Sequence, residues 1–258
     1  MIHNIIKDKS TRLFIILGGF FIANALLAEI IGVKLFSLEK TMGWDPANLQ
    51  LFGNSFSFNL TAGVVLWPVV FIMTDIINEY YGPKGVRFLS FLTIVLIAYA
   101  FIMFSAAIGL VPADFWAKDY FEGVPDSNKA FSGIFGQSQS IIIASLIAFL
   151  VSQILDVFIF HRIKRATGEN KIWLRATAST LVSQLIDSFL VLFIAFYVFP
   201  QGKAWPLSQV LSTCAGNYMY KFIIAVAMTP VIYLVHGIIE RYLGRGLAAE
   251  MKRGAMGR

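Results

Sequence analysis

Long apolar segments separated by short polar ones dominate this chain. Each apolar segment has about 18 residues or more, which is enough to cross a hydrocarbon core of roughly 30 Å as a helix. The six segments occupy residues 12–36, 60–81, 86–110, 138–161, 172–199 and 209–239. The pattern predicts an all-α integral membrane protein, a single membrane domain over 1–258 with six transmembrane helices.

The composition supports the same class. Hydrophobic residues make up 57% of the 258 residues and charged residues only 14%, whereas soluble domains are about 45 to 50% apolar and about 25% charged. The single cysteine, Cys214, excludes an internal disulfide. The net charge of +6 could indicate an acidic partner or nucleic acid, but the positions of the basic residues favour a different explanation.

The lysines and arginines sort by loop. Fifteen of the 21 lie on one predicted side of the membrane: Lys7, Lys9, Arg12, Lys84, Arg87, Arg162, Lys164, Arg165, Lys171, Arg175, Arg241, Arg245, Lys252, Arg253 and Arg258. The alternate loops hold Lys34, Lys40, Lys118, Lys129 and Lys203. The positive-inside rule then places both termini in the cytoplasm, with the basic tail 241–258 able to lie against anionic lipid.

Proline, glycine and alternating patterns predict the breaks in these helices. Pro68 is expected to kink the second helix, and Gly82 followed by Pro83 to end it. Thr229 with Pro230 predicts a kink in the last helix. Residues 51–59 alternate phenylalanine with serine or asparagine, which predicts an extended external segment or a lid. The outer loop 111–136 mixes acidic and aromatic residues, which favours an interfacial helix over a lid.

Two neighbouring apolar segments carry near copies of one polar motif. It reads S-Q-L-I-D-S-F at 183–189 and S-Q-I-L-D-V-F at 152–158. On a helix its serine, glutamine and aspartate share one face. These side chains are Ser183, Gln184 and Asp187 and, in the copy, Ser152, Gln153 and Asp156. Because the connection between the segments is short, the helices should be antiparallel neighbours whose motifs point inward, as around transporter midplane sites.

Further polar groups lie deep in other apolar segments. Asp75, Asn78 and Glu79 share one helical face, and Asn217 lies one turn before Lys221. A lysine this deep cannot easily reach the interface, so we expect Lys221 to pair with Asp187, Asp156 or Asp75. Glu29 in the first helix either reaches the outer interface or belongs to the same pathway.

Three readings compete for this set of polar groups. Interhelical hydrogen bonding alone needs only serine or asparagine, whereas buried ionisable groups usually mark a substrate or ion path. Asp156 and Asp187 could form the dyad of an intramembrane aspartyl protease, but glutamine and bulky aliphatic residues precede both. No hydrolase or phosphate-binding motif occurs, and the three histidines are too isolated to indicate a metal site. No catalytic residue and no cofactor is predicted.

A transporter for a small, planar, polar solute fits best. Carboxylates accept two adjacent donors, amides serve a donor and acceptor edge, and aromatic rings such as Trp67 offer a stacking face. This combination suits a purine-like base.

Three motifs then indicate a family. T-D-I-I-N-E-Y-Y-G at 74–82, S-Q-L-I-D-S-F, and N-Y-M-Y-K at 217–221 followed by T-P at 229–230 resemble signatures of the queuosine precursor transporter family, also called the vitamin uptake transporter family. The resemblance covers roughly 12–240, although the long loop 111–136 has no match in the family pattern. It implies import of deazaguanine bases across the bacterial inner membrane and carries over to Asp75, Glu79, Gln184, Asp187, Asn217 and Lys221. Gln153 and Asp156 rest on the internal repeat.

The residue types suggest a role for each of these side chains in binding the base and leave the energy source of transport open. Asp187 or Asp75 would take the N–H edge of the base, Gln184 and Asn217 its carbonyl side, and Lys221 would balance charge. The carboxylates could carry protons, the protein could be a facilitator, or the chain could resemble the substrate-binding subunit of an ATPase-driven vitamin importer. The expected partners are the bilayer and a purine-like small molecule, not nucleic acid, and the oligomeric state is undetermined.

Overall fold

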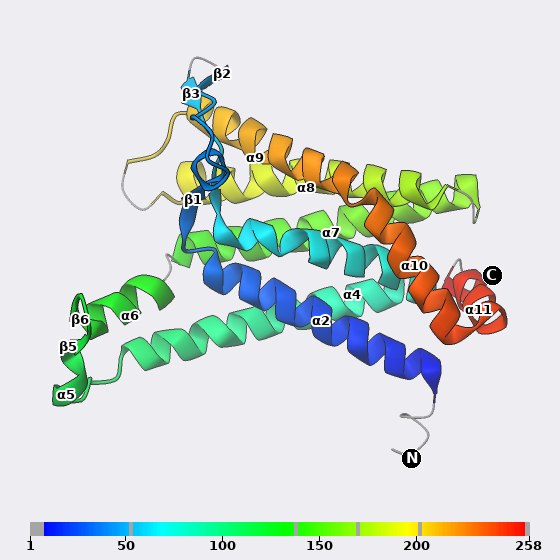
Figure 1. Cartoon of the computed structure of the whole chain (residues 1–258), viewed down its shortest axis with the longest axis horizontal. Helices are drawn as coiled ribbons and strands as arrows, with labels where there is room; N and C mark the ends of the chain where they lie inside the picture. Colours follow the sequence, from blue (N-terminus) through cyan, green and yellow to red (C-terminus); the bar gives the residue numbers. More distant parts are fainter. Residues whose placement is uncertain (1–7, 52–53, 137–138, 169–170, 201–202, 256–258) are drawn as a thin grey trace.

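The protein is a bundle of long helices with small hairpins at one end (Figure 1). The computed structural model describes residues 8–51, 54–136, 139–168, 171–200 and 203–255. Within these residues, five helices are long and apolar enough to cross a membrane: α2 (Lys9–Ile31), α4 (Trp67–Ile108), α7 (Gln139–Thr167), α8 (Ile172–Phe193) with its π-helical extension η2 (Ile194–Val198), and α9 (Leu207–Ala227). The prediction of an all-α membrane protein is confirmed at this level.

Helix α4 is two helices joined at one residue. Gly82 has φ 70° and ψ −172°, a conformation that glycine adopts at little steric cost. A Cβ atom on Gly85 would lie 3.5 Å from Ile77 Cγ2, although residues eight apart in a straight helix are separated by about 12 Å. The chain therefore folds back on itself at Gly82.

Contacts with α2 show that the direction reverses. Before the turn, Gly63 packs against the backbone of Ala28, and the Tyr81 hydroxyl donates to the Ser10 carbonyl at 2.7 Å. After the turn, Leu89 packs against Gly18. The chain thus descends along α2 from its end to its start and then climbs back, so the two arms of α4 are antiparallel (Figure 1). Gly82 acts as the helix stop that the sequence predicted.

The expected kink at Pro68 is wrong. Pro68 lies in the first turn of α4, where proline lacks only an N–H that would have no helical partner. Residues 60–66, predicted as helix, instead form the end of strand β4 (Asn59–Thr61) and the 3₁₀-helix η1 (Ala62–Val65). The first arm of α4 therefore begins only at Trp67 and is shorter than the sequence predicted.

Other helix boundaries also differ from the sequence prediction. Helix α2 ends at Ile31, and β1 (Leu35–Ser37) pairs with β4 in a small antiparallel sheet. Helix α7 continues past residue 161 to Thr167, which brings Lys164 and Arg165 into the helix. Met228 separates α9 from α10 (Thr229–Leu243), so the predicted break at Thr229 and Pro230 is confirmed.

The connecting segments form hairpins and short helices. Between α2 and α4 lie α3 (Leu38–Thr41) and the pair β2 (Leu49–Leu51) and β3 (Asn54–Phe56), so the extended 51–59 segment is confirmed for its described residues. The loop 111–136 contains α5 (Asp114–Ala117), the pair β5 (Lys118–Phe121) and β6 (Val124–Asp126), and the amphipathic helix α6 (Ser127–Phe135). These elements extend away from the bundle (Figure 1).

The basic tail forms a helix that packs against one end of the bundle. Helix α11 (Arg245–Ala255) follows Gly244 and buries Ala248. The backbone of Ala255 lies against Gly82, and Lys9 donates to the Tyr242 carbonyl at 3.0 Å. The start of α2, the turn of α4 and α11 therefore gather at one end of the bundle. Lys7 and Arg258 of the predicted basic set lie outside the described residues.

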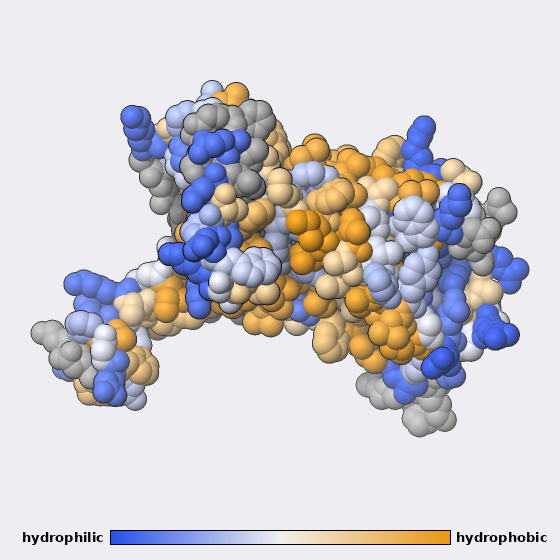
Figure 2. All heavy atoms as spheres, turned by 45° about the horizontal axis from the view of Figure 1, so that its top comes forward, coloured by the Kyte–Doolittle hydropathy of each residue, from blue (hydrophilic) through white to orange (hydrophobic). Residues whose placement is uncertain are grey.

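Apolar and polar side chains are separated along the length of the bundle. In Figure 2 apolar side chains cover the middle of the bundle, and hydrophilic ones gather at its two ends. Many large apolar side chains on the helix surfaces are exposed, such as Phe91, Ile102 and Leu234, as expected for surfaces that face lipid. The protein is a multi-pass membrane protein.

Candidate functional site

The two copies of the polar motif bind each other. The Ser183 hydroxyl donates to Asp156, with 3.3 Å between Oγ and Oδ1, and the Ser152 hydroxyl approaches Asp187 Oδ1 at 3.5 Å. Each serine thus serves the aspartate of the other copy. This arises because serine and aspartate lie four residues apart on the facing sides of antiparallel helices α7 and α8. The inward orientation that the repeat predicted is confirmed, with an approximate local two-fold symmetry.

Asp187 has a cation partner on a third helix. Lys221 of α9 places Nζ 2.7 Å from Asp187 Oδ2, and the two side chains are only 13% and 15% exposed. Of the three partners that the sequence allowed for Lys221, the fold selects Asp187. The pair removes much of the cost of holding either charge away from water.

Asp75 lies in the wall of a narrow cleft between α4, α8, α9 and α10. The cavity in this cleft has a volume of about 20 Å³, which is room for roughly one water molecule. Its apolar surfaces include Pro68 and Phe71 on one side and Met228 on the other, and Thr180 adds a hydroxyl. Asp75 is 3% exposed, and its Oδ1 has no hydrogen-bond partner among the described residues. A buried carboxylate oxygen without a hydrogen-bond partner needs a ligand, a water molecule or a proton.

Several other buried amides lie on α4, α7 and α8, outside the lining of this cleft. Asn78, Gln153 and Gln184 are at most 5% exposed. Within the described chain, the Gln153 and Gln184 amide oxygens, and both polar side-chain atoms of Asn78, lack hydrogen-bond partners. Native proteins rarely leave such groups unsatisfied. These three amides lie on the same helices as Asp75, Asp156 and Asp187.

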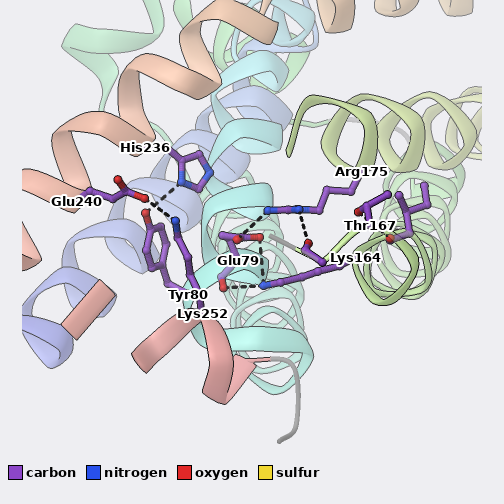
Figure 3. A network of polar contacts seen from close by, with 10 residues as sticks. Glu79, Tyr80, Lys164, Thr167, Arg175, His236, Glu240 and Lys252 are labelled. Carbon is purple, nitrogen blue, oxygen red and sulfur yellow. Dashed lines mark hydrogen bonds and ion pairs between the residues drawn. The ribbon is translucent and has the colours of Figure 1, made fainter. Parts of the chain in front are cut away.

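Glu79 belongs to a separate, fully buried ion network (Figure 3). Its carboxylate lies 3.1 Å from Lys164 Nζ and 2.8 Å from an Arg175 guanidinium nitrogen. Lys164 also donates to the Glu79 carbonyl at 3.0 Å, and Arg175 to the Gly168 carbonyl at 3.0 Å. The network ties α4, α7 and α8 together near the turn at Gly82.

The partners of Glu79 were missed from the sequence, where both were counted as loop residues. The spacing of residues in the sequence nevertheless indicated that both cations are buried. Arg175, Ser179, Ser183 and Asp187 follow one another at intervals of four, and Lys164 continues the buried row of Val157 and Phe160. Helical periodicity therefore places both cations on the inward faces of their helices.

The remaining predicted residues take less central positions. Trp67 starts α4 and stacks its ring on Phe71 and against Phe149, with centroids 5.9 Å apart in each pair, so it packs on the hydrophobic core. Asn217 is half-buried one turn before Lys221. Glu29 accepts a hydrogen bond from Ser145 of α7 at 2.7 Å, which connects it to the polar face of α7.

Comparison with known proteins identifies the family of this chain. The model described as "Putative vitamin uptake transporter" matches residues 61–235. The chain belongs to the vitamin uptake transporter family. The matched segment holds all nine predicted site residues, together with Lys164 and Arg175.

Individual members of the family carry more specific names. The chain is 31% identical over 202 residues to the "Probable queuosine precursor transporter" of Bacillus subtilis, covering 75% of this chain and 80% of the relative. A Haemophilus influenzae protein of the same name is 29% identical over 243 residues, or 93% of each chain. The "Queuosine precursor transporter" of Escherichia coli is 25% identical over 208 residues, covering 81% of this chain and 85% of the relative. No solved structure matches the chain.

Proposed function

We propose that this protein imports queuosine precursors, the deazaguanine bases, across the bacterial inner membrane. Membership of the family and the names of three relatives support the substrate class. The single structural observation that carries the proposal is the buried Asp75 carboxylate, with one unpartnered oxygen, in the wall of a cleft.

We further propose six membrane crossings with both termini in the cytoplasm. Support for six comes from α4, whose two antiparallel arms would each cross, in addition to the other four long helices. Support for the orientation comes from Lys9, Arg12, Lys84, Arg87 and the basic residues of α11, which lie at one end of the bundle. The hairpins and α6 would then face outward.

Asp75 is the better candidate for the N–H edge of the base. Sequence reasoning left Asp75 and Asp187 as alternatives, but Asp187 is already held by Lys221 at 2.7 Å. A guanine-like edge presents two parallel N–H groups, and a carboxylate accepts both. Asp75 would therefore bind this edge, while the Asp187–Lys221 pair would fix the relative positions of α8 and α9.

Amides and apolar side chains would complete the site. Gln153, Gln184 and Asn78 have unsatisfied amide groups that can serve the carbonyl side of the base, and Asn217 would do so from α9. Phe71 and Met228 would cover the ring faces. Glu79 would act at a distance by holding α4 against α7 and α8.

The contacts of Asp187 argue against a protease dyad. Two catalytic aspartates activate water by sharing one proton, whereas Asp187 is neutralised by a lysine. We therefore propose transport and not catalysis as the activity.

Uptake of a labelled deazaguanine base into proteoliposomes that contain this chain alone tests the proposal. Wild-type protein should accumulate or exchange the base, and Asp75→Asn should lose this activity because an amide cannot accept two N–H bonds. Asp114→Asn, on the exposed helix α5, is the matched control. Full activity in Asp75→Asn would refute the site. Transport that appears only after a partner ATPase is added would favour the importer-subunit alternative.

A further inference from the structure

The cleft beside Asp75 is too small to admit a base. Its cavity of about 20 Å³ has room for roughly one water molecule, whereas binding sites for small molecules occupy about 300–1,000 Å³. Entry or release of a base therefore requires one wall of the cleft to move. The walls are α4 with Phe71, α8 with Thr177 and Thr180, the end of α9, and the start of α10 with Ile232.

Three of these walls are tied together by ion pairs. Glu79 of α4 lies against Lys164 of α7 and Arg175 of α8. The Asp187–Lys221 pair joins α8 to α9. Separating such pairs away from water leaves a charge without its partner, which is costly. The wall that remains free of these pairs among the described residues is α10.

Helix α10 is joined to α9 at a break in the helix. Met228 ends α9 and precedes α10, and Pro230 lacks the N–H that would bond to the Val226 carbonyl in a continuous helix. The outer face of α10 exposes Leu234 and Ile238, and this face borders lipid in the membrane. Helix α10 can therefore tilt outward about Met228 without displacing another helix.

Contacts with Tyr80 of α4 hold the far half of α10 in place (Figure 3). The Tyr80 hydroxyl and His236 Nδ1 of α10 lie 3.1 Å apart, with ring centroids separated by 5.4 Å. Lys252 of α11 pairs with Glu240 of α10 and places its Nζ 5.5 Å from the centroid of the Tyr80 ring. The ion pair links α11 to α10, and both helices meet α4 at the same tyrosine.

We propose that α10 and α11 form a gate that tilts about Met228 and opens the cleft to the cytoplasm. Opening separates Tyr80 from His236, breaks the contact between the Thr177 and Thr229 hydroxyls, which lie 3.3 Å apart, and withdraws the α10 wall from the cleft. Single hydrogen bonds contribute less than buried ion pairs, so this wall yields before the others. The inference rests on the proposed transport function and orientation and names the part that moves.

An engineered zinc bridge tests whether the contact between α4 and α10 must open. Tyr80→His places a second imidazole beside His236, and two histidines can bind one zinc ion at about 2.0–2.1 Å. Zinc should raise the melting temperature of this variant and abolish its uptake of the base into proteoliposomes, and a chelator should restore both. Tyr80→Phe, which keeps a ring but offers no metal ligand, is the matched control and should not respond to zinc in either measurement.

The motion can also be measured without substrate. Thr180→Cys places a thiol in the wall of the cleft, and Cys214→Ala removes the native thiol. In inside-out vesicles a membrane-impermeant maleimide should label this cysteine from the cytoplasmic side. Zinc should stop the labelling when Tyr80→His is also present, and should leave it unchanged with Tyr80→Phe.

The outcomes separate the gate from the transport function. Full uptake by zinc-bridged Tyr80→His, or a cysteine at position 180 that is never labelled or is labelled regardless of the bridge, would overturn the gate and leave transport intact. A melting temperature of Tyr80→His that zinc does not raise would contradict the contact on which the gate depends. Labelling that follows the zinc bridge, in a protein that takes up no deazaguanine base, would support the gate and overturn the proposed substrate.

Discussion

Ser183 donates a hydrogen bond to Asp156, with 3.3 Å between Oγ and Oδ1, across the contact between α7 and α8. The equivalent serine of the other motif, Ser152, approaches Asp187 in return. The two aspartates are therefore positioned by the same helix pairing. A change in the register of these helices would displace both Asp156 and the Asp187–Lys221 pair.

The Asp187–Lys221 pair should show strong coupling in a double-mutant cycle. Lys221→Met leaves Asp187 without its cation, and breaking a buried pair costs about 3–5 kcal/mol. Because the side chains keep 13% and 15% exposure, we expect the lower part of this range. Asp187→Asn combined with Lys221→Met should recover much of the lost thermal stability in detergent.

The Asp187→Asn and Lys221→Met variants also test whether the pair is needed for transport. Uptake should fall in both single variants because the pair fixes α9 against α8 beside the cleft. A double variant no more stable than Lys221→Met, or undiminished uptake in both single variants, would contradict this role.

Glu79→Gln should destabilise the protein far more than a similar change nearby. It removes the carboxylate that lies against Lys164 and Arg175 in a fully buried network, and breaking such a buried pair costs about 3–5 kcal/mol. Glu240→Gln is the control, since Glu240 pairs with Lys252 but is 44% exposed, and such pairs contribute about 1 kcal/mol or less. Equal melting temperatures for the two variants would show that the network is not the main connection between α4, α7 and α8.

The turn of α4 should require glycine. Gly82→Ala places a side chain at φ 70°, and its Cβ would lie 3.0 Å from the Ala255 carbonyl oxygen, for a cost of about 1–3 kcal/mol. Gly19→Ala is the matched control, because a Cβ there meets no atom within 4 Å. Thermal unfolding should separate the two variants clearly, and a neutral Gly82→Ala would argue against a sharp turn at this residue.

Glu39 should make the outer hairpins sensitive to acid. Burial alone would raise the pKa of Glu39, but hydrogen bonds from the Phe58 and Ala47 backbone and the Ser37 hydroxyl outweigh it, so the pKa lies below its usual value of 4.5. A lowered pKa means that the stabilisation is complete above this value and is lost as the pH falls through the folded-state pKa.

Hydrogen exchange at the Phe58 amide, which donates to Glu39 at 2.7 Å, measures this effect. After correction for intrinsic rates, its protection should fall as the pH drops below about 4.5, while the Ile97 amide inside α4 stays protected. Glu39→Gln should weaken protection at neutral pH and remove its dependence on pH over this range. A Phe58 amide whose protection does not change with pH would contradict the assignment.

Part of the site could be predicted from the sequence because helical periodicity is a local property. The repeated motif places Ser183 and Asp187 on one face whatever surrounds them, and a lysine as deep as Lys221 requires an acidic partner. The choice between Asp75, Asp156 and Asp187 could not be predicted, because it depends on the distance between α9 and its neighbours. The role of Lys164 was missed because a basic residue after an apolar segment usually marks a loop.

The sequence by itself determined the membrane class, the family, the repeated polar motif and the breaks at Gly82 and Thr229, since each depends on composition or on neighbours along the chain. Only the tertiary structure decided that Lys221 serves Asp187, that Glu79 is held by Lys164 and Arg175, and that no ion pair reaches Asp75 or Asp156 among the described residues. The physical reason is that a buried charge is stabilised by whichever opposite charge packing brings within about 4 Å, and packing joins residues that are far apart in the chain.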